Sequence, residues 1–197
     1  MKILVLLVLA SALNAETTIY NSKAIVHPEV GKNGMVVSQH YLATNAGHSI
    51  LAEGGNAYDA SIAVAFALAV VLPRAGNIGG GGFMVMFDEA SQESYSIDYR
   101  ETAPEAATKN MFLASDGSVD KKRATQGVLS IGVPGTVYGM WEVHKKFGSL
   151  PWSKLLAPAI KLAEEGFLVS PFMADALNKR YKKLGKYKNF KNIFYSN

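Results

Sequence analysis

The hydrophobic pattern of the chain alternates between helical periodicity and short strand-like runs. A strand is predicted at residues 35–38, and an antiparallel hairpin is predicted from strands at 83–87 and 94–99. The predicted helices span residues 41–53, 57–72, 134–146, 151–156, 158–165 and 171–182. Helices that precede and follow a central hairpin are typical of an α+β chain in which helices pack on an antiparallel sheet.

Glycine and proline mark the predicted boundaries of these elements. Gly54 and Gly55 end the first helix, and Pro73 ends the second, since proline cannot continue a helix. Pro158 is expected to divide the stretch from 151 to 165 into two short helices, because it removes a backbone donor. Ser170 is expected to cap the last helix. The polar connection from 108 to 125 contains a turn signal at Asp116-Gly117.

The second helix and the hairpin are the predicted core. Residues 60–71 are apolar almost all round the helix, so this helix is expected to be buried on most faces. It is too short to span a membrane and belongs to a protein core. The apolar run from 83 to 87 predicts that the hairpin is buried as well. Arg100 follows directly after the hairpin, where a rigid sheet can present its side chain.

The N-terminus has the three-part layout of a secretory signal peptide. Lys2 precedes the apolar run 3–10, and small residues follow at Ser11, Ala12 and Ala15. We expect a signal peptide over residues 1–15, with cleavage after Ala12 or after Ala15. The apolar run is too short for a transmembrane anchor, which needs about 20 residues. Export to a periplasm or to the outside of the cell is therefore expected.

Positive charge is concentrated near the C-terminus. Seven of the 20 basic residues lie between Lys179 and Lys191, without an acidic residue among them, although the formal charge of the whole chain is only +4. Tyr and Phe residues interleave with these lysines, a pattern that also occurs in nucleic-acid or anionic-membrane binding. Nucleic acid is not an expected partner of an exported protein. The tail is therefore interpreted as a solvated helix end and a loop whose aromatic residues would pack on a portion of the subunit outside this chain.

Several catalytic motifs are absent from the sequence. The chain has no cysteine, and its four histidines lack H-E-x-x-H spacing, so no metal site is predicted. No G-x-S-x-G elbow occurs, and we assign no catalytic residue within the chain. The run Gly79-Gly80-Gly81-Gly82 is not followed by Gly-Lys-Ser/Thr and leads into a strand, which excludes a phosphate-binding loop. We interpret it as a structural loop that needs positive φ or close backbone approach.

Five segments, in this order, make the chain resemble the γ-glutamyltransferase (glutathione hydrolase) family. They lie at residues 52–60, 79–83, 99–104, 132–135 and 156–160, and the resemblance extends from about Val26 to Pro171. It implies an N-terminal-nucleophile hydrolase with a four-layer αββα sandwich that cuts its own precursor. Residues 16–197 would then form the N-terminal portion of the large subunit, an incomplete part of that sandwich.

The resemblance also implies a function for Arg100. In the family pattern, the arginine before Glu-x-Ala-Pro binds the α-carboxylate of the γ-glutamyl group, and this chain has Arg100-Glu101-Thr102-Ala103-Pro104. Without the resemblance, an arginine between Asp98 and Glu101 would be an ordinary ion-pair residue. The implied substrates are glutathione and other γ-glutamyl compounds, whose glutamyl group passes to water or to an acceptor amine, without a metal or organic cofactor.

The nucleophile and the remaining subunit are expected outside these residues. The resemblance implies a threonine at the head of a small subunit from the same precursor, downstream of Asn197, so this chain alone is predicted to be inactive. Two alternatives remain open at this point. One is a related N-terminal-nucleophile amidase, such as a cephalosporin-type acylase, and the other is a truncated, non-catalytic exported protein.

Overall fold

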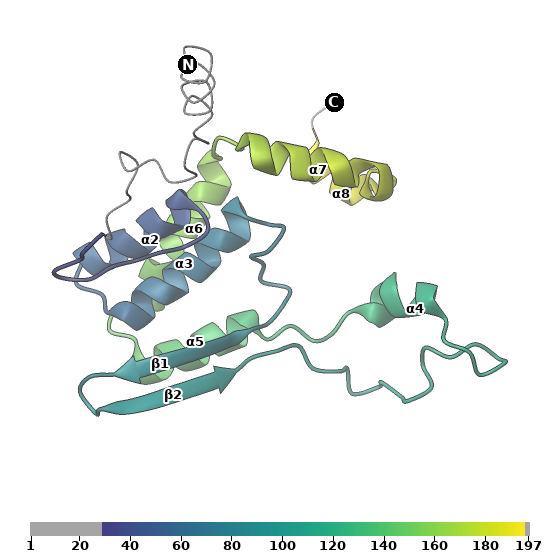
Figure 1. Ribbon diagram of the computed structural model, residues 1–197, viewed down its shortest axis with the longest axis horizontal. Coiled ribbons are helices and arrows are strands. Elements are labelled where there is room, and N and C mark those ends of the chain that lie inside the picture. Colours follow the sequence, from purple (N-terminus) through teal and green to yellow (C-terminus); the bar gives the residue numbers. More distant parts are fainter. Residues whose placement is uncertain (1–28, 196–197) are drawn as a thin grey trace, which may run out of the picture. The chain divides into compact units, whose positions relative to one another are not determined.

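The computed structural model describes residues 29–195, and residues from Val36 onward form one compact unit that contains every element below. The expected signal peptide lies outside the described residues. The helices and strands are α2 (Tyr41–Ala52), α3 (Ala57–Val71), β1 (Phe83–Asp88), β2 (Glu93–Asp98), α4 (Lys121–Thr125), the 3-10 turn η3 (Val128–Ser130), α5 (Thr136–Phe147), α6 (Trp152–Glu165), α7 (Pro171–Leu184) and α8 (Lys188–Phe194). This mixture of helices and one antiparallel hairpin confirms the α+β prediction (Figure 1).

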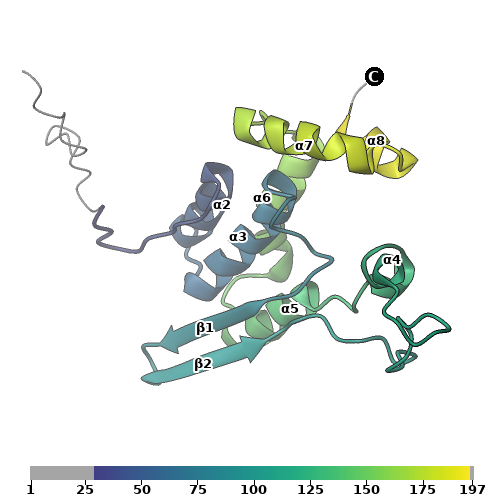
Figure 2. The same ribbon diagram turned by 45° about the vertical axis from the view of Figure 1, so that its right-hand side comes forward.

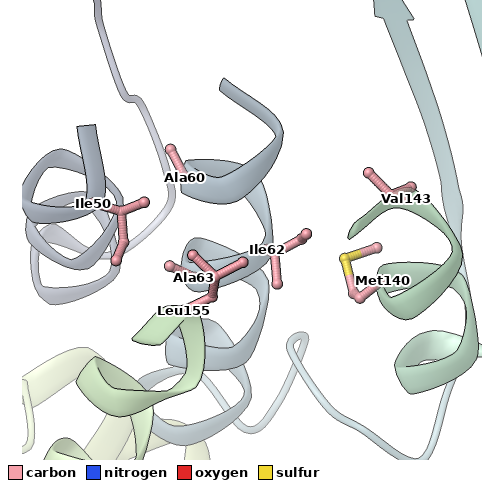
Figure 3. Close-up of a cluster of buried hydrophobic side chains, with 7 residues drawn as sticks. All are labelled: Ile50, Ala60, Ile62, Ala63, Met140, Val143 and Leu155. Carbon is pink, nitrogen blue, oxygen red and sulfur yellow. The ribbon is translucent and has the colours of Figure 1, made fainter. Parts of the chain in front are cut away.

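Helix α3 is the centre of the fold, as its apolar sequence predicts. It packs against α2, α5 and α6, so most of its faces are covered. Seven buried side chains from these four helices form the main core cluster (Figure 3), and they are Ile50, Ala60, Ile62, Ala63, Met140, Val143 and Leu155. Alanines on α3 leave room for close helix approach, and the larger side chains of the neighbouring helices fill the space between them.

A buried carboxylate fixes the start of α3. Asp59 has no exposed surface, and one of its oxygens accepts from the backbone N–H of Asn56 at 3.1 Å while the side chain of Asn56 accepts from the N–H of Asp59. This is a capping box, which satisfies N-terminal helix donors reciprocally. Asp59 also accepts from the backbone N–H groups of Ser149 and Leu150 and from the Ser149 hydroxyl. The carboxylate therefore ties the turn between α5 and α6 to the start of α3.

The hairpin is buried on one face only. Met84 pairs with Ile97 and Met86 pairs with Tyr95. Met84, Met86 and Ile97 pack against the core, and Tyr95, on the same face, packs on Phe147. The pleat directs Phe83, Val85 and Phe87 to the opposite face, where the exposed fraction of Val85 is 82%. The prediction of a buried hairpin therefore holds for its inner face and is wrong for the outer face of β1, since the helices within residues 29–195 cover only the inner face (Figure 2).

Helix α6 continues through Pro158, contrary to the predicted break. It runs without interruption from Trp152 to Glu165. A proline inside a helix costs about 3 kcal/mol or more. Leu155 and Ala159, on either side of the proline, are both buried in the contact with α3, and this tertiary packing offsets the local cost.

Two further predictions about elements are wrong. Residues 35–38 form no strand, because no backbone partner lies beside them within residues 29–195; the side chain of Val36 nevertheless packs against the core. The tail after α7 forms helix α8 instead of a loop. The hydroxyl of Tyr195 donates to the carbonyl of Leu177, and the Tyr195 ring packs on Tyr181, so the aromatic residues of the tail contact α7 and one another.

The remaining boundaries follow the local signals. Ser170 caps α7 by accepting from the N–H of Met173, and Gly117 adopts positive φ in the predicted turn. Within residues 29–195, none of the helices combines the length and the hydrophobicity that a membrane crossing requires.

Candidate functional site

Three segments that are distant in sequence meet around Arg100. The backbone N–H of Tyr99 donates to the carbonyl of Gly82 at 3.0 Å, which extends the β1–β2 pairing by one residue. Thr102 and Val133 exchange two backbone hydrogen bonds, at 3.2 and 2.8 Å. These hydrogen bonds join the glycine loop, the segment after β2 and the segment before α5 into one backbone cluster. The long connection between Thr102 and Val133, which contains α4, starts and ends at this cluster (Figure 2).

The glycine loop caps helix α5. The N-cap residue of α5 is Gly135, which has no side chain to satisfy the first helical donors. The carbonyl of Gly80 accepts from the N–H of Gly135 at 2.9 Å and from the N–H of Thr136 at 3.0 Å. The loop therefore replaces a side-chain cap, and it holds the start of α5 against the end of the hairpin.

Close approach explains why glycines occupy this cluster. A Cβ on Gly81 would lie 2.5 Å from the carbonyl oxygen of Tyr99 and 2.7 Å from the Cα of Arg100. A Cβ on Gly135 would overlap the same Tyr99 carbonyl from the other segment. None of the residues Gly79–Gly82 has positive φ, so of the two expected reasons for the run only close approach applies. The backbone of Tyr99 and Arg100 is therefore packed between Gly81 of the glycine loop and Gly135 at the start of α5.

Arg100 itself lies at the surface end of this cluster. Its side chain is 61% exposed, and its Nε donates to the Glu101 carboxylate at 3.2 Å. Its guanidinium carbon lies 5.8 Å from the ring centre of Phe83, and its backbone N–H donates to Asp98 at 2.9 Å. The ordinary ion pair is therefore present, but an exposed pair of this kind contributes little to stability.

The remaining edge of the guanidinium is able to bind an anion. Glu101 occupies only the Nε–H, and within residues 29–195 no hydrogen bond from either terminal nitrogen of Arg100 is formed. Arginine presents its donors in a planar fork that matches a carboxylate. The described arrangement thus offers a charged, partly open donor edge at the end of a rigid hairpin.

The sequence interpretation missed Tyr99 and Gly139. Tyr99 lies on the inner face of the hairpin, and burial raises the pKa of its phenol. A Cβ on Gly139 would overlap the Cβ and Cγ of Tyr99, and a Cβ on Gly82 would lie 3.0 Å from the edge of its ring. The spacing of Gly135 and Gly139 puts both glycines on one face of α5, and this spacing was the signal for close packing.

No metal-binding cluster occurs near Arg100. Across residues 29–195, no group of three His, Asp or Glu side chains is close enough to bind an ion. Two apolar clefts of about 390 and 420 Å³ lie elsewhere, one behind the hairpin and one between α3, α6 and the glycine loop. Arg100 lines neither of these two clefts.

Comparison with known proteins identifies the relatives of the chain. The family model described as gamma-glutamyltranspeptidase matches residues 43–197. A glutathione hydrolase proenzyme from a Pseudomonas species is 46% identical over 86% of this chain, and one from Escherichia coli is 45% identical over 87%. The chain spans 29% and 30% of the length of these two curated relatives.

Solved structures agree with the sequence matches. The γ-glutamyltranspeptidase of Helicobacter pylori superposes with a TM-score of 0.82 and 47% identity, over 86% of this chain and 48% of that chain. A cephalosporin acylase from Bacillus halodurans gives a TM-score of 0.72 at 29% identity, over 89% of this chain and 34% of that chain. These matches confirm the predicted fold class, an incomplete part of an N-terminal-nucleophile hydrolase sandwich. With the family model covering most of its residues, the chain belongs to the γ-glutamyltranspeptidase family.

Proposed function

We propose that this chain is the substrate-binding front part of an enzyme that transfers the γ-glutamyl group of glutathione and related compounds to water or to an acceptor amine. Arg100 binds the α-carboxylate of the γ-glutamyl donor. The observation that supports this role most directly is the exposed guanidinium of Arg100, with one donor on Glu101 and its outer edge open, on a backbone held between Gly81 and Gly135.

Binding and bond cleavage are divided between segments in this proposal. A threonine hydroxyl from the small subunit of the same precursor attacks the γ-carbonyl, and its own α-amino group accepts the proton. That proton passes to the departing amine as the amide C–N bond breaks, which leaves a γ-glutamyl ester on the threonine. Water or an acceptor amine then attacks the ester, which releases the glutamyl group and returns the proton to the threonine hydroxyl. This chain contributes orientation, because a carboxylate held by Arg100 places the carbonyl within reach of the nucleophile. The relatives named proenzymes support the division into segments. The 197-residue chain alone is accordingly expected to hydrolyse no γ-glutamyl anilide.

Substitution of Arg100 tests the proposal in the full product of the gene that encodes this chain. Arg100→Ala removes charge-assisted hydrogen bonds worth about 1.5–3 kcal/mol, so the KM for a γ-glutamyl anilide should rise roughly tenfold to a hundredfold. Arg100→Lys keeps the charge but loses the fork, so it should restore only part of the affinity. Arg123→Ala, on the exposed helix α4, is the matched control and should leave KM unchanged. An unchanged KM in Arg100→Ala would refute the assignment.

A second candidate is an amidase for other acyl groups, and it is favoured by the likeness to the cephalosporin acylase. Parallel assays with a γ-glutamyl anilide and a cephalosporin-type amide separate the two. We expect turnover of the γ-glutamyl compound, because the anionic α-carboxylate complements Arg100. Exclusive turnover of the other amide would favour the acylase, and no turnover of either by the full gene product would favour a non-catalytic protein.

Residues 1–15 are proposed as an export signal and residues 16–197 as the N-terminal portion of the large subunit. The layout of Lys2, the apolar run and the small residues supports export to a periplasm or to the outside of the cell. N-terminal sequencing of the mature protein tests this, since it should begin at Leu13 or at Glu16. A mature protein that begins at Met1 would contradict the proposal.

A further inference from the structure

The side chain of Tyr99 has no place in the binding step described above, although it adjoins Arg100. Alternation along the strand directs Tyr99 inward and Arg100 outward, so the two side chains leave the same backbone on opposite faces. The Tyr99 ring packs with the core, and its hydroxyl lies 3.4 Å from the carbonyl of Phe83, a long contact that contributes little.

Glycines from two segments surround this tyrosine. Gly82 precedes β1, and its missing Cβ admits the edge of the Tyr99 ring. Gly139 lies in the first turns of α5, and its missing Cβ admits the Cβ and Cγ of the same side chain. Gly135, one turn earlier, admits the Tyr99 carbonyl. We name these three glycines the Tyr99 socket.

We infer that Tyr99, seated in this socket, is a positioning residue that fixes where the guanidinium of Arg100 lies. The inference rests on the proposed function, because it assumes that Arg100 binds the donor. The long side chain of Arg100 is exposed, and within residues 29–195 its ion pair is with Glu101 and its cation–π contact is with Phe83. Neither of these two surface contacts fixes the backbone of Arg100, so that backbone must be held by the residues packed behind it. Sites of this kind require their side chains within about 0.5 Å of the productive geometry.

The expected kinetic effect falls on substrate binding. If the base of Arg100 shifts, the carboxylate is held less well in the ground state and in the transition state alike, which raises KM and leaves kcat nearly constant. For Tyr99→Ala we expect the donor KM to rise about tenfold, less than the roughly 100-fold loss that a 1 Å displacement can cause. Tyr99→Phe keeps the ring and should restore the KM of the native protein.

Tyr95→Ala is the matched control. Tyr95 lies on the same strand and the same face, four residues before Tyr99, and packs on Phe147. Its removal should lower the melting temperature, as removal of Tyr99 should, but its distance along the strand from Arg100 should leave KM unchanged. A merely structural role for Tyr99 predicts that the two alanine variants behave alike.

The experiment measures kcat and KM for a γ-glutamyl anilide, together with thermal melting, in the full gene product carrying Tyr99→Ala, Tyr99→Phe, Tyr95→Ala or Arg100→Ala. A raised KM in Tyr99→Ala but not in Tyr95→Ala supports the inference. An equal KM in these two variants overturns it. If Arg100→Ala alone raises KM, the proposed function stands and the positioning role fails; if Arg100→Ala leaves KM unchanged, the proposed function fails first.

A second variant keeps the test valid where Tyr99→Ala does not fold. Gly82→Ala retains the tyrosine and places a methyl group 3.0 Å from the ring edge, so the ring must shift by a few tenths of an ångström. We expect a raised KM with a nearly constant kcat. An unchanged KM in folded Gly82→Ala overturns the inference.

Discussion

Removal of the Asp59 carboxylate should be among the most destabilising single changes in this chain. Its oxygens accept from Asn56, Ser149 and Leu150, and the group has no exposed surface. Asp59→Ala removes the acceptor that these donors share. Ser149 is exposed, so water can replace the carboxylate there, whereas Asn56 and Leu150 are largely buried.

The loss in the free energy of unfolding is worked out from the backbone N–H groups of Asn56 and Leu150, the two donors that water reaches poorly. Each lost hydrogen bond to a charged group costs about 1.5 kcal/mol or more, which gives a loss of about 3 kcal/mol for Asp59→Ala. With a urea m-value of about 2 kcal/mol/M, the unfolding midpoint should fall by about 1.5 M. Asp59→Asn keeps the shape but turns an NH₂ group toward N–H donors, so it should recover less than half of the loss.

Urea unfolding of the 197-residue chain, followed by circular dichroism, measures these midpoints. Asp175→Ala is the control, because Asp175 is 60% exposed and its ion pair within residues 29–195 is with Lys179, one turn away in α7. An exposed pair of this spacing contributes about 0.3–0.5 kcal/mol. If Asp59→Ala and Asp175→Ala shift the midpoint equally, the buried carboxylate does not hold the start of α3 against the turn between α5 and α6.

Three further predictions concern the core, the hairpin turn and α6. Leu155→Ala should cost about 2–5 kcal/mol in urea unfolding, whereas Ile160→Ala, at an exposed position of the same helix, should cost well under half of that. The hydroxyl and backbone N–H of Ser91 lower the pKa of Asp88 below its usual 3.8, so the stability that Asp88 contributes is present above that pH and is lost as the pH falls through the lower folded value. Asp88→Asn should therefore flatten the acid side of a stability–pH profile, and an unchanged profile would contradict this. Pro158→Ala should raise the free energy of unfolding by about 3 kcal/mol, and the melting temperature with it, because it restores a helical donor. A lower melting temperature would mean that α6 needs the proline.

The sequence by itself determined the features that depend on neighbouring residues. Gly54, Pro73 and Ser170 set helix ends through local sterics and hydrogen bonds, and the structure confirms those ends within two residues. The continuous apolar run at 83–87 and the alternation at 94–99 determined the two strands of the hairpin. The end of the second strand determined that Arg100 follows it directly. These signals act over a few residues, so a linear pattern contains them in full.

Only the tertiary structure decided which distant segments share a site. Gly139 lies 40 positions after Tyr99, and nothing local in either segment indicates that α5 packs its glycine face on that ring. Packing against α3 likewise overrode the local preference of Pro158. The exposed outer face of β1 could not be predicted from its apolar sequence, because burial depends on which elements cover a strand and not on the strand alone. Contacts of this kind are set by the arrangement of whole elements, where packing free energy outweighs local propensity.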